Sequence, residues 1–258
     1  MFQFDCHAHV YEAVSAISQA RYVPETAAPL STWKKTLDRH GLTGGVIVQV
    51  SFLGTDNSEL CDALKRLDPD KFAGVAVVPV DIDDAELDRL VETGIRGLRW
   101  NLVGGADLPI PLSMQCQTFF EKLKARNLHL EIHLEGPRLA PLLPVLADQG
   151  LNLVIDHFGL PSERKPVDDP MIKAVRLLHD RSNIFYKFSA PYRTPFDLTS
   201  HGEELLRLLD EGHVVWGSDW PHTQHEGQAI ESQVHDFAER WKTIDDGLAV
   251  KKLFGLSG

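Results

Sequence analysis

The chain has 258 residues, of which 43% are hydrophobic, and a formal net charge of −11. This length suits one domain over residues 1–258, and the acidic balance argues against a nucleic-acid or membrane-surface binder, because such proteins need a basic face. The three cysteines form no CxxC, so we expect no disulfide framework and a cytoplasmic location. No apolar run reaches the ~18 residues of a membrane span. We therefore expect a protein that binds a small molecule, either as a monomer or as a homo-oligomer.

Short apolar runs alternate with amphipathic stretches from one end of the chain to the other. The eight runs that we predict as strands are Phe2–Ala8, Gly45–Ser51, Ala73–Val80, Ile95–Asn101, Leu128–Leu134, Leu151–His157, Ile184–Ala190 and His213–Asp219. A stretch that can form a helix follows each run, and continuous Val, Ile and Leu content suits parallel strands covered on both faces. Eight such units predict a single-domain (β/α)8 TIM barrel of the α/β class.

Capping residues mark the start of three predicted helices. Asp83 or Asp84 can cap AELDRLVET, and Ser113 can cap MQCQTFFEKLKARN. Asp169 precedes Pro170, which suits the first turn of a helix. A doubly wound sheet is the rival architecture, but it usually shows GxGxxG after its first strand, where this chain has CHAHVYE. Catalytic groups of barrels lie at the carboxyl ends of strands, so candidate site residues are expected at those ends.

Histidines gather at these predicted strand ends. With a side-chain period of two, Asp5, His7 and His9 are predicted to point to one face of the first strand. Two imidazoles so placed can bind a metal ion or donate hydrogen bonds to a carbonyl oxygen, and a pair of surface histidines is the alternative. His133 and His157 lie at the predicted ends of the fifth and sixth strands.

Asp219 ends the eighth predicted strand, in the segment WGSDWPH. Its carboxylate follows an apolar run and precedes Trp220 and Pro221, so we expect it to be partly desolvated beside the imidazoles. Such a carboxylate suits a general base. The alternative is a residue that caps the next helix or makes a turn.

Three of these motifs, the HxH of the first strand, IDHFG and GSDWPH, resemble those of the amidohydrolase superfamily. Within it, the segments VQVSFLGTDN, GIRGLRWNLV and YKFSAPYR are most similar to the branch of 2-pyrone-4,6-dicarboxylate lactonases and related sugar-acid lactonases. The resemblance implies that Asp219 activates a water molecule. It also implies that His7, His9 and His157 polarise the lactone carbonyl and that arginines hold substrate carboxylates.

The resemblance places Arg99 and Arg193 on the arginine-bearing motifs. A guanidinium grips a carboxylate bidentately, although for Arg99 pairing with a neighbouring acidic residue is the alternative. Helix capping is the alternative for Asn57, and simple packing is the alternative for Tyr192. The full set of further candidates for substrate contact is Gln49, Ser51, Asn57, Asn101, His133 and Tyr192.

The chain departs from relatives that bind two metal ions, which carry a bridging lysine or glutamate on strand four or five, where this chain has RWN. The sequence leaves open either no cofactor or one divalent ion such as zinc on His7, His9 and Asp219, joined by His133 or His157. The favoured activity is hydrolysis of a carboxylated lactone. The alternatives are a sugar-acid lactonase or lactone isomerase, a mononuclear zinc-dependent hydrolase or decarboxylase, and a non-catalytic binder of an anionic metabolite.

Overall fold

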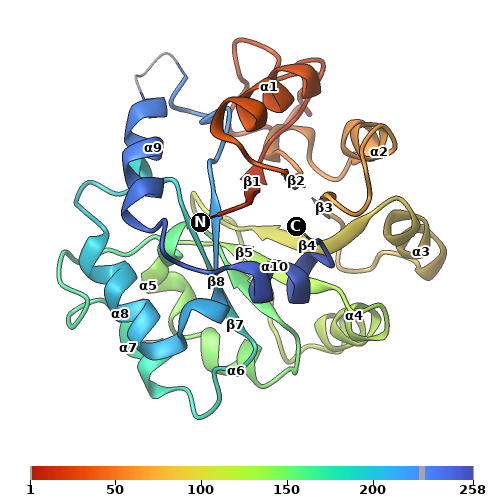
Figure 1. Ribbon diagram of the computed structural model, residues 1–258. Helices are drawn as coiled ribbons and strands as arrows, with labels where there is room; N and C mark the ends of the chain where they lie inside the picture. The colour runs from red at the N-terminus through yellow and green to blue at the C-terminus, as the bar shows by residue number, and fades with distance from the viewer. Residues whose placement is uncertain (1, 227–229, 258) are drawn as a thin grey trace.

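A computed structural model describes residues 2–226 and 230–257 and shows one sheet of eight parallel strands that neighbour one another in chain order. The strands are β1 (Phe4–Ala8), β2 (Gly44–Val48), β3 (Phe72–Ala76), β4 (Ile95–Asn101), β5 (His129–His133), β6 (Leu153–Ile155), β7 (Ile184–Ser189) and β8 (Val214–Gly217). A bridge between Ala8 and Trp220 joins the two edges of the sheet. The predicted (β/α)8 barrel is therefore confirmed (Figure 1).

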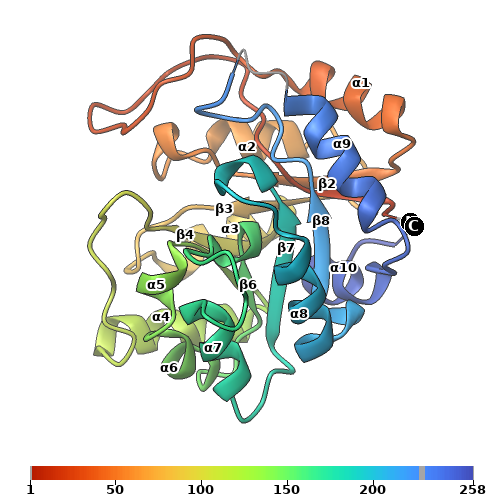
Figure 2. The ribbon, with the colours of Figure 1, turned by 90° about the vertical axis from the view of Figure 1, so that its left-hand side faces the viewer.

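Helices surround this barrel on the outside (Figures 1 and 2). They are α1 (Leu30–His40), α2 (Ser58–Leu64), α3 (Asp84–Glu92), α4 (Met114–Ala125), α5 (Gly136–Leu139), α6 (Leu143–Ala147), α7 (Pro170–Leu177), α8 (Thr199–Leu209), α9 (Ile230–Arg240) and α10 (Gly247–Phe254). Helix α10 lies across the end of the barrel where the strands begin (Figure 1). In the part of the chain that the structure describes, no helix combines the length and apolar character needed to cross a bilayer.

The predicted helix caps are present. Asp83 caps α3, since its side chain accepts a hydrogen bond from the backbone N–H of Glu86. Ser113 caps α4 in the same way. The carboxylate of Asp169 accepts hydrogen bonds from two backbone N–H groups at the start of α7, and Pro170 occupies the first turn. These side chains satisfy donors that a helix leaves unpaired at its start, so the starts predicted for these three helices from capping residues are confirmed.

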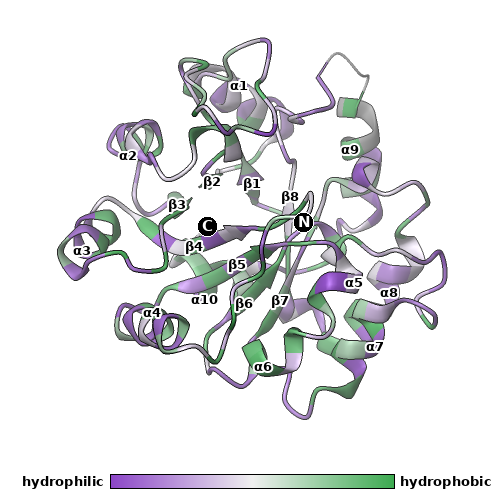
Figure 3. Ribbon diagram, turned by 180° about the vertical axis from the view of Figure 1, so that it is seen from behind, coloured by the Kyte–Doolittle hydropathy of each residue, from purple (hydrophilic) through white to green (hydrophobic). Residues whose placement is uncertain are grey.

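The interior of the barrel is apolar at one end and polar at the other. Where the strands begin, Phe4, Cys6 and Phe185 pack with Val250 and Phe254 of α10. In Figure 3 the ribbons of β6 and β7 are mostly green, whereas the helices mix green with purple, as expected for elements with one face in solvent. The apolar end supports the fold, which leaves the carboxyl ends of the strands free to carry polar side chains.

Strand β1 contains an irregularity that changes the direction of its side chains. The register against β2 shifts between Asp5 and Ala8, as at a β-bulge. Asp5 consequently points away from the interior, and its carboxylate accepts a hydrogen bond of 3.0 Å from the indole of Trp33 in α1. The prediction that Asp5 shares the face of His7 and His9 is therefore wrong, because strict alternation does not hold across a bulge.

Candidate active site

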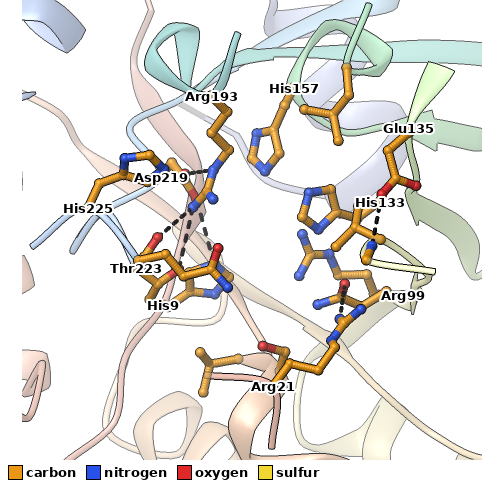
Figure 4. Close-up of a pocket in the computed structure, with 17 residues that line it drawn as sticks. His9, Arg21, Arg99, His133, Glu135, His157, Arg193, Asp219, Thr223 and His225 are labelled. Atoms are coloured by element: carbon orange, nitrogen blue, oxygen red, sulfur yellow. Dashed lines mark hydrogen bonds and ion pairs between the residues drawn. The ribbon is translucent and has the colours of Figure 1, made fainter. Parts of the chain in front are cut away.

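A pocket of about 380 Å³ lies at the carboxyl ends of the strands, a volume within the usual range for small-molecule sites. Predicted residues that line it are His9, Ser51, Arg99, Asn101, His133, His157, Arg193 and Asp219. Figure 4 shows His133 across the pocket from Asp219 and Arg193, with His157 between the two sides. The predicted strand ends thus converge on one concave surface.

Asp219 is fully buried and its two carboxylate oxygens have different surroundings. Oδ2 accepts hydrogen bonds from Arg193 Nε at 2.7 Å and from the Tyr192 hydroxyl at 2.5 Å. Oδ1 lies 3.6 Å from both His7 Nε2 and His9 Nε2. Among the described residues, neither Asp219 Oδ1 nor His7 Nε2 has a hydrogen-bond partner. Buried polar atoms are rarely left unpaired, so these two mark where a ligand or a water molecule would bind.

The charge of Asp219 is set by two opposing effects. Burial, the largest single effect, raises the pKa of this carboxyl group, but the adjacent Arg193 guanidinium together with the neighbouring histidines outweighs burial and holds the pKa well below its usual range. Asp219 is therefore ionised throughout the neutral pH range, as a proton acceptor must be.

Three histidines of the site, His7, His133 and His157, are neutral. Burial, followed by the charge of Lys187, lowers the pKa of His7 to about 3. Burial also lowers the pKa values of His133 and His157 well below the ordinary histidine value. The His157 ring lies 4.8 Å from that of His7 and 4.9 Å from that of His133, measured between centroids. Neutral imidazoles can each offer one N–H and one lone pair to a ligand.

His9 and His157 are each oriented through Nδ1. His9 Nδ1 lies 2.8 Å from the backbone oxygen of Val48, and because a carbonyl only accepts, this nitrogen carries the proton. His157 Nδ1 lies 2.8 Å from the hydroxyl oxygen of Ser189, which can donate or accept. In both residues the second ring nitrogen is left for the pocket.

The turns that follow β6, β7 and β8 are conformationally unusual. His157, Ala190 and Asp219 have φ angles of 51°, 48° and 58°, in the left-handed region that residues other than glycine seldom adopt. Such residues cluster at functional sites when the surrounding structure holds them in place. At Gly217 a Cβ atom would lie 2.5 Å from the Cβ of His7, so only glycine allows β8 to approach β1 this closely.

A network of buried charges lies beneath the pocket. Lys187 Nζ is 2.5 Å from Glu131 Oε2, and Arg99 donates to Asp156 Oδ2 from Nε at 2.9 Å and from Nη2 at 2.7 Å. All four residues are almost completely buried. For Arg99 the pairing with an acidic neighbour is thus what the structure shows, although Arg99 also lines the pocket.

Sequence reasoning missed Lys187, Glu131 and Asp156. Glu131 lies on β5, so a glutamate is present on one of the two strands where relatives with two metal ions carry a bridging residue. Here its carboxylate forms ion pairs with Lys187 and Arg99. A signal was available, because Glu131 stands two residues before His133 and therefore shares its face of the strand. A charged residue inside an apolar strand is the pattern that would have identified Glu131 and Lys187, whereas Asp156 directly follows the end of β6.

Gln49 and Asn57 are used within the protein and do not line the pocket. Gln49 Nε2 donates to the backbone oxygen of Asp56 at 2.5 Å. Asn57 donates to the backbone oxygen of Val77 at 2.8 Å and accepts from its N–H at 3.1 Å. Both side chains brace the loops around the site, and Asn57 begins α2 without a side-chain capping bond.

The rim of the pocket contains an arginine that sequence reasoning missed. Arg21, from the segment between β1 and α1, donates to Asn101 Oδ1 at 3.0 Å and lines the pocket near Arg99 (Figure 4). Over the described ranges, Arg21 forms no ion pair, whereas Arg99 and Arg193 each contact a carboxylate. Arg21 is thus the pocket guanidinium whose charge stays uncompensated.

By spacing alone, buried groups at the site could hold a metal ion. The potential ligand atoms of His7, His157 and Asp219 lie within 4.8 Å of one another, and two further groups add His133, Asp156 and Glu131 in different combinations. The neighbouring charges oppose such an ion. Arg193 Nε is 2.7 Å from Asp219 and Lys187 Nζ is 3.2 Å from His7, so two cations already border two of the ligands.

A model of the family described as Amidohydrolase matches residues 4–249. Among characterised proteins, the chain is 28% identical over 235 residues to 2-pyrone-4,6-dicarboxylate hydrolase of Comamonas testosteroni, covering 84% of this chain and 76% of that protein. It is 26% identical over 230 residues to 4-sulfomuconolactone hydrolase of Rhizobium radiobacter, covering 85% of this chain and 76% of that protein.

Two solved structures extend the comparison. A probable 2-pyrone-4,6-dicarboxylic acid hydrolase from Acinetobacter baumannii with bound citric acid has a TM-score of 0.86 at 32% identity, over 99% of this chain and 100% of that chain. An amidohydrolase from Burkholderia multivorans with bound zinc has the same fold, with a TM-score of 0.78 at 15% identity over the full length of both chains. Since the family model spans residues 4–249, this protein belongs to the amidohydrolase family.

Proposed function

We propose that the protein is a hydrolase that opens a lactone ring bearing carboxylate groups. The observation that carries this proposal is Asp219 Oδ1, a buried and ionised oxygen without a partner among the described residues, 3.6 Å from both His7 Nε2 and His9 Nε2. A base that faces imidazoles at the bottom of a pocket is the arrangement that acyl transfer to water requires. The named relatives, which hydrolyse lactones, support the same class of reaction.

The attacking water is held by two acceptors. Because His9 donates from Nδ1 to a backbone oxygen, its Nε2 offers a lone pair, and Asp219 Oδ1 offers another 3.6 Å away. A water molecule between them can donate one hydrogen to each atom, which leaves its oxygen lone pair free to attack. In this arrangement His9 orients the water. This role differs from the one that the family resemblance implies, in which His9 polarises the lactone carbonyl.

The ring carbonyl is polarised by the remaining imidazoles. His7 and His157 are buried beside each other and neutral, so each can present an N–H to the carbonyl oxygen as negative charge develops there. By analogy with donors of oxyanion holes, each such hydrogen bond contributes about 3 kcal/mol to lowering the barrier. Both donors are almost completely buried and held by neighbouring side chains, so they need little reorganisation during the reaction.

The proton that Asp219 takes from water is returned to the leaving group. Asp219 takes a proton from the water as its oxygen bonds to the carbonyl carbon. When the intermediate collapses, the bond between the acyl carbon and the ring oxygen breaks, and protonated Asp219 can return the proton to that leaving oxygen. The products are a new carboxylate and a hydroxyl or enol group, and the new acid loses its proton to solvent.

The arginines of the pocket support the proposal that the substrate carries carboxylate groups. Arg21 carries an uncompensated charge at the rim, and Arg99 and Arg193 line the pocket beside it. A substrate carboxylate that pairs with Arg193 would compete with Asp219 for the guanidinium. Because that guanidinium holds the pKa of Asp219 down, such pairing would make Asp219 a stronger base only when substrate is bound.

The reaction is proposed to proceed without a metal ion. The spacing of His7, His157 and Asp219 favours a mononuclear zinc hydrolase or decarboxylase as the second candidate. The cations next to two of these ligands oppose it, since Lys187 and Arg193 both repel a divalent ion. Stoichiometric zinc in the purified protein, lost together with activity on chelation, would establish the second candidate in place of the first.

A panel of lactones in ¹⁸O-labelled water tests the proposal. We expect ring opening of 2-pyrone-4,6-dicarboxylate or a related carboxylated lactone, with one labelled oxygen in the new carboxylate. Faster turnover of uncharged sugar lactones would instead indicate a sugar lactonase, and conversion without label would indicate an isomerase. Stabilisation by these compounds without any product would contradict catalysis and indicate a binding protein.

A further inference from the structure

Lys187 of β7 is a buried cation in direct contact with the proposed reaction centre. Its side chain is inaccessible to solvent, and its ammonium lies 2.5 Å from Glu131 Oε2 and 3.8 Å from Asp156 Oδ1. The same nitrogen lies 3.2 Å from His7 Nδ1. Charges placed in a protein interior are costly, and replacing a whole buried ion pair such as Lys187 and Glu131 by hydrophobic side chains of similar size is often neutral for stability. The contact with His7 gives Lys187 a role that packing does not.

The contact determines where His7 carries its proton. An ammonium group only donates hydrogen bonds, so His7 Nδ1 must accept and the ring proton must be on Nε2. Asp156 Oδ1, 3.4 Å from the same nitrogen, would favour the opposite tautomer. This oxygen is farther from Nδ1 than the Lys187 ammonium is, and by geometry it forms no hydrogen bond within the described residues, which favours the alignment of His7 with Lys187.

We propose that Lys187 is a positioning residue, which fixes His7 in the tautomer protonated on Nε2 and thereby directs an N–H at the reaction centre. His7 Nε2 is buried, has no partner within residues 2–226 and 230–257, and lies 3.6 Å from Asp219 Oδ1. In the other tautomer the same atom would present a lone pair, which a carbonyl oxygen repels. The catalytic consequence of this inference rests on the proposed lactonase function, whereas the tautomer itself does not.

The tautomer is measured directly by ¹⁵N NMR of the full-length protein without substrate. The ring nitrogens of His7 are assigned by their absence in His7→Gln, and protonated and unprotonated ring nitrogens differ in chemical shift. We expect an unprotonated Nδ1 and a protonated Nε2 in the wild type. A protonated Nδ1 in the wild type would overturn the proposal without the need for any variant.

A double variant tests whether Lys187 is the cause. Lys187→Met alone would leave Glu131 buried without its cation, so we combine it with Glu131→Met to remove both charges. Asp156 is then the nearest polar group to Nδ1, and we expect the His7 proton to move to Nδ1. Lys122→Met is the matched control, since Lys122, like Lys187, pairs with a carboxylate, but it lies on α4 outside the barrel, where it donates to the backbone oxygen of Ile82. The His7 tautomer should not change in that variant.

Kinetics separate this role from a structural one. In the double variant we expect kcat to fall about 10²- to 10³-fold, as when one oxyanion donor is removed, with little change in KM. An unchanged tautomer in the folded double variant would refute Lys187 as its cause. Absence of lactonase activity in the wild type would refute the proposed function and leave the tautomer result standing, so the two failures are distinguishable.

Discussion

The pH dependence of stability should reveal whether His7 is neutral and buried, as the tautomer proposed for it requires. Burial and the charge of Lys187 lower the pKa of His7 from 6.5 to about 3. The unfolded chain therefore binds a proton at this residue at a pH where the folded protein does not, and stability is lost as the pH falls from 6.5 towards 3. Between pH 7 and pH 5, this one residue lowers the free energy of unfolding by about 2 kcal/mol.

The assay is urea unfolding at several pH values for the wild type and His7→Gln, whose side chain does not titrate. We expect the wild type to lose about 2 kcal/mol more than the variant between pH 7 and pH 5. His179→Gln removes an exposed histidine and should follow the wild-type curve. Equal slopes for the wild type and His7→Gln would refute the reasoning, since His7 would then titrate alike in both states.

Three further outcomes are expected. Replacing the uncompensated rim cation by Arg21→Met should raise KM for a dicarboxylated lactone about 10- to 100-fold with little effect on kcat, whereas an equal rise for an uncharged lactone would argue against an anion site. Because Asp219, His133 and His157 all titrate well below their ordinary values, none should contribute a limb to the kcat/KM profile between pH 5 and 8; a limb there that vanishes in His133→Gln or His157→Gln would contradict this. Dialysis against a chelator should leave activity and unfolding temperature unchanged, and a loss restored by zinc would show that the bordering cations do not prevent metal binding.

The sequence predicted the barrel and the centre of the site because both depend on local patterns. Apolar runs of strand length identified the eight strands, and His7, His9, His157 and Asp219 stood at their ends. Parallel strands bring their carboxyl ends to one face of the barrel, so residues far apart in the chain could be grouped before any coordinates were known.

What the sequence did not predict depends on contacts between distant segments. Asp5 was placed on the wrong face because a bulge interrupts the alternation of β1. Lys187 lay inside an apolar run, and the carboxylates that explain its burial, Glu131 and Asp156, come from other parts of the chain. Arg21 reaches the pocket from an irregular segment without a periodic pattern. The side chain of Asn57 forms hydrogen bonds with the backbone of Val77, a contact that helix-capping rules do not predict.

The most direct test of the central claim is the Asp219→Asn variant, assayed for ring opening and for binding of the same carboxylated lactone. Asparagine keeps the shape of the side chain but cannot take a proton from water, so kcat should fall by about 10²- to 10⁴-fold or more while the dissociation constant stays within a few fold of the wild type. Circular dichroism and the unfolding midpoint provide the control for folding, because Arg193 loses its carboxylate partner. A variant that binds the lactone and still opens it at a rate close to that of the wild type would contradict the account.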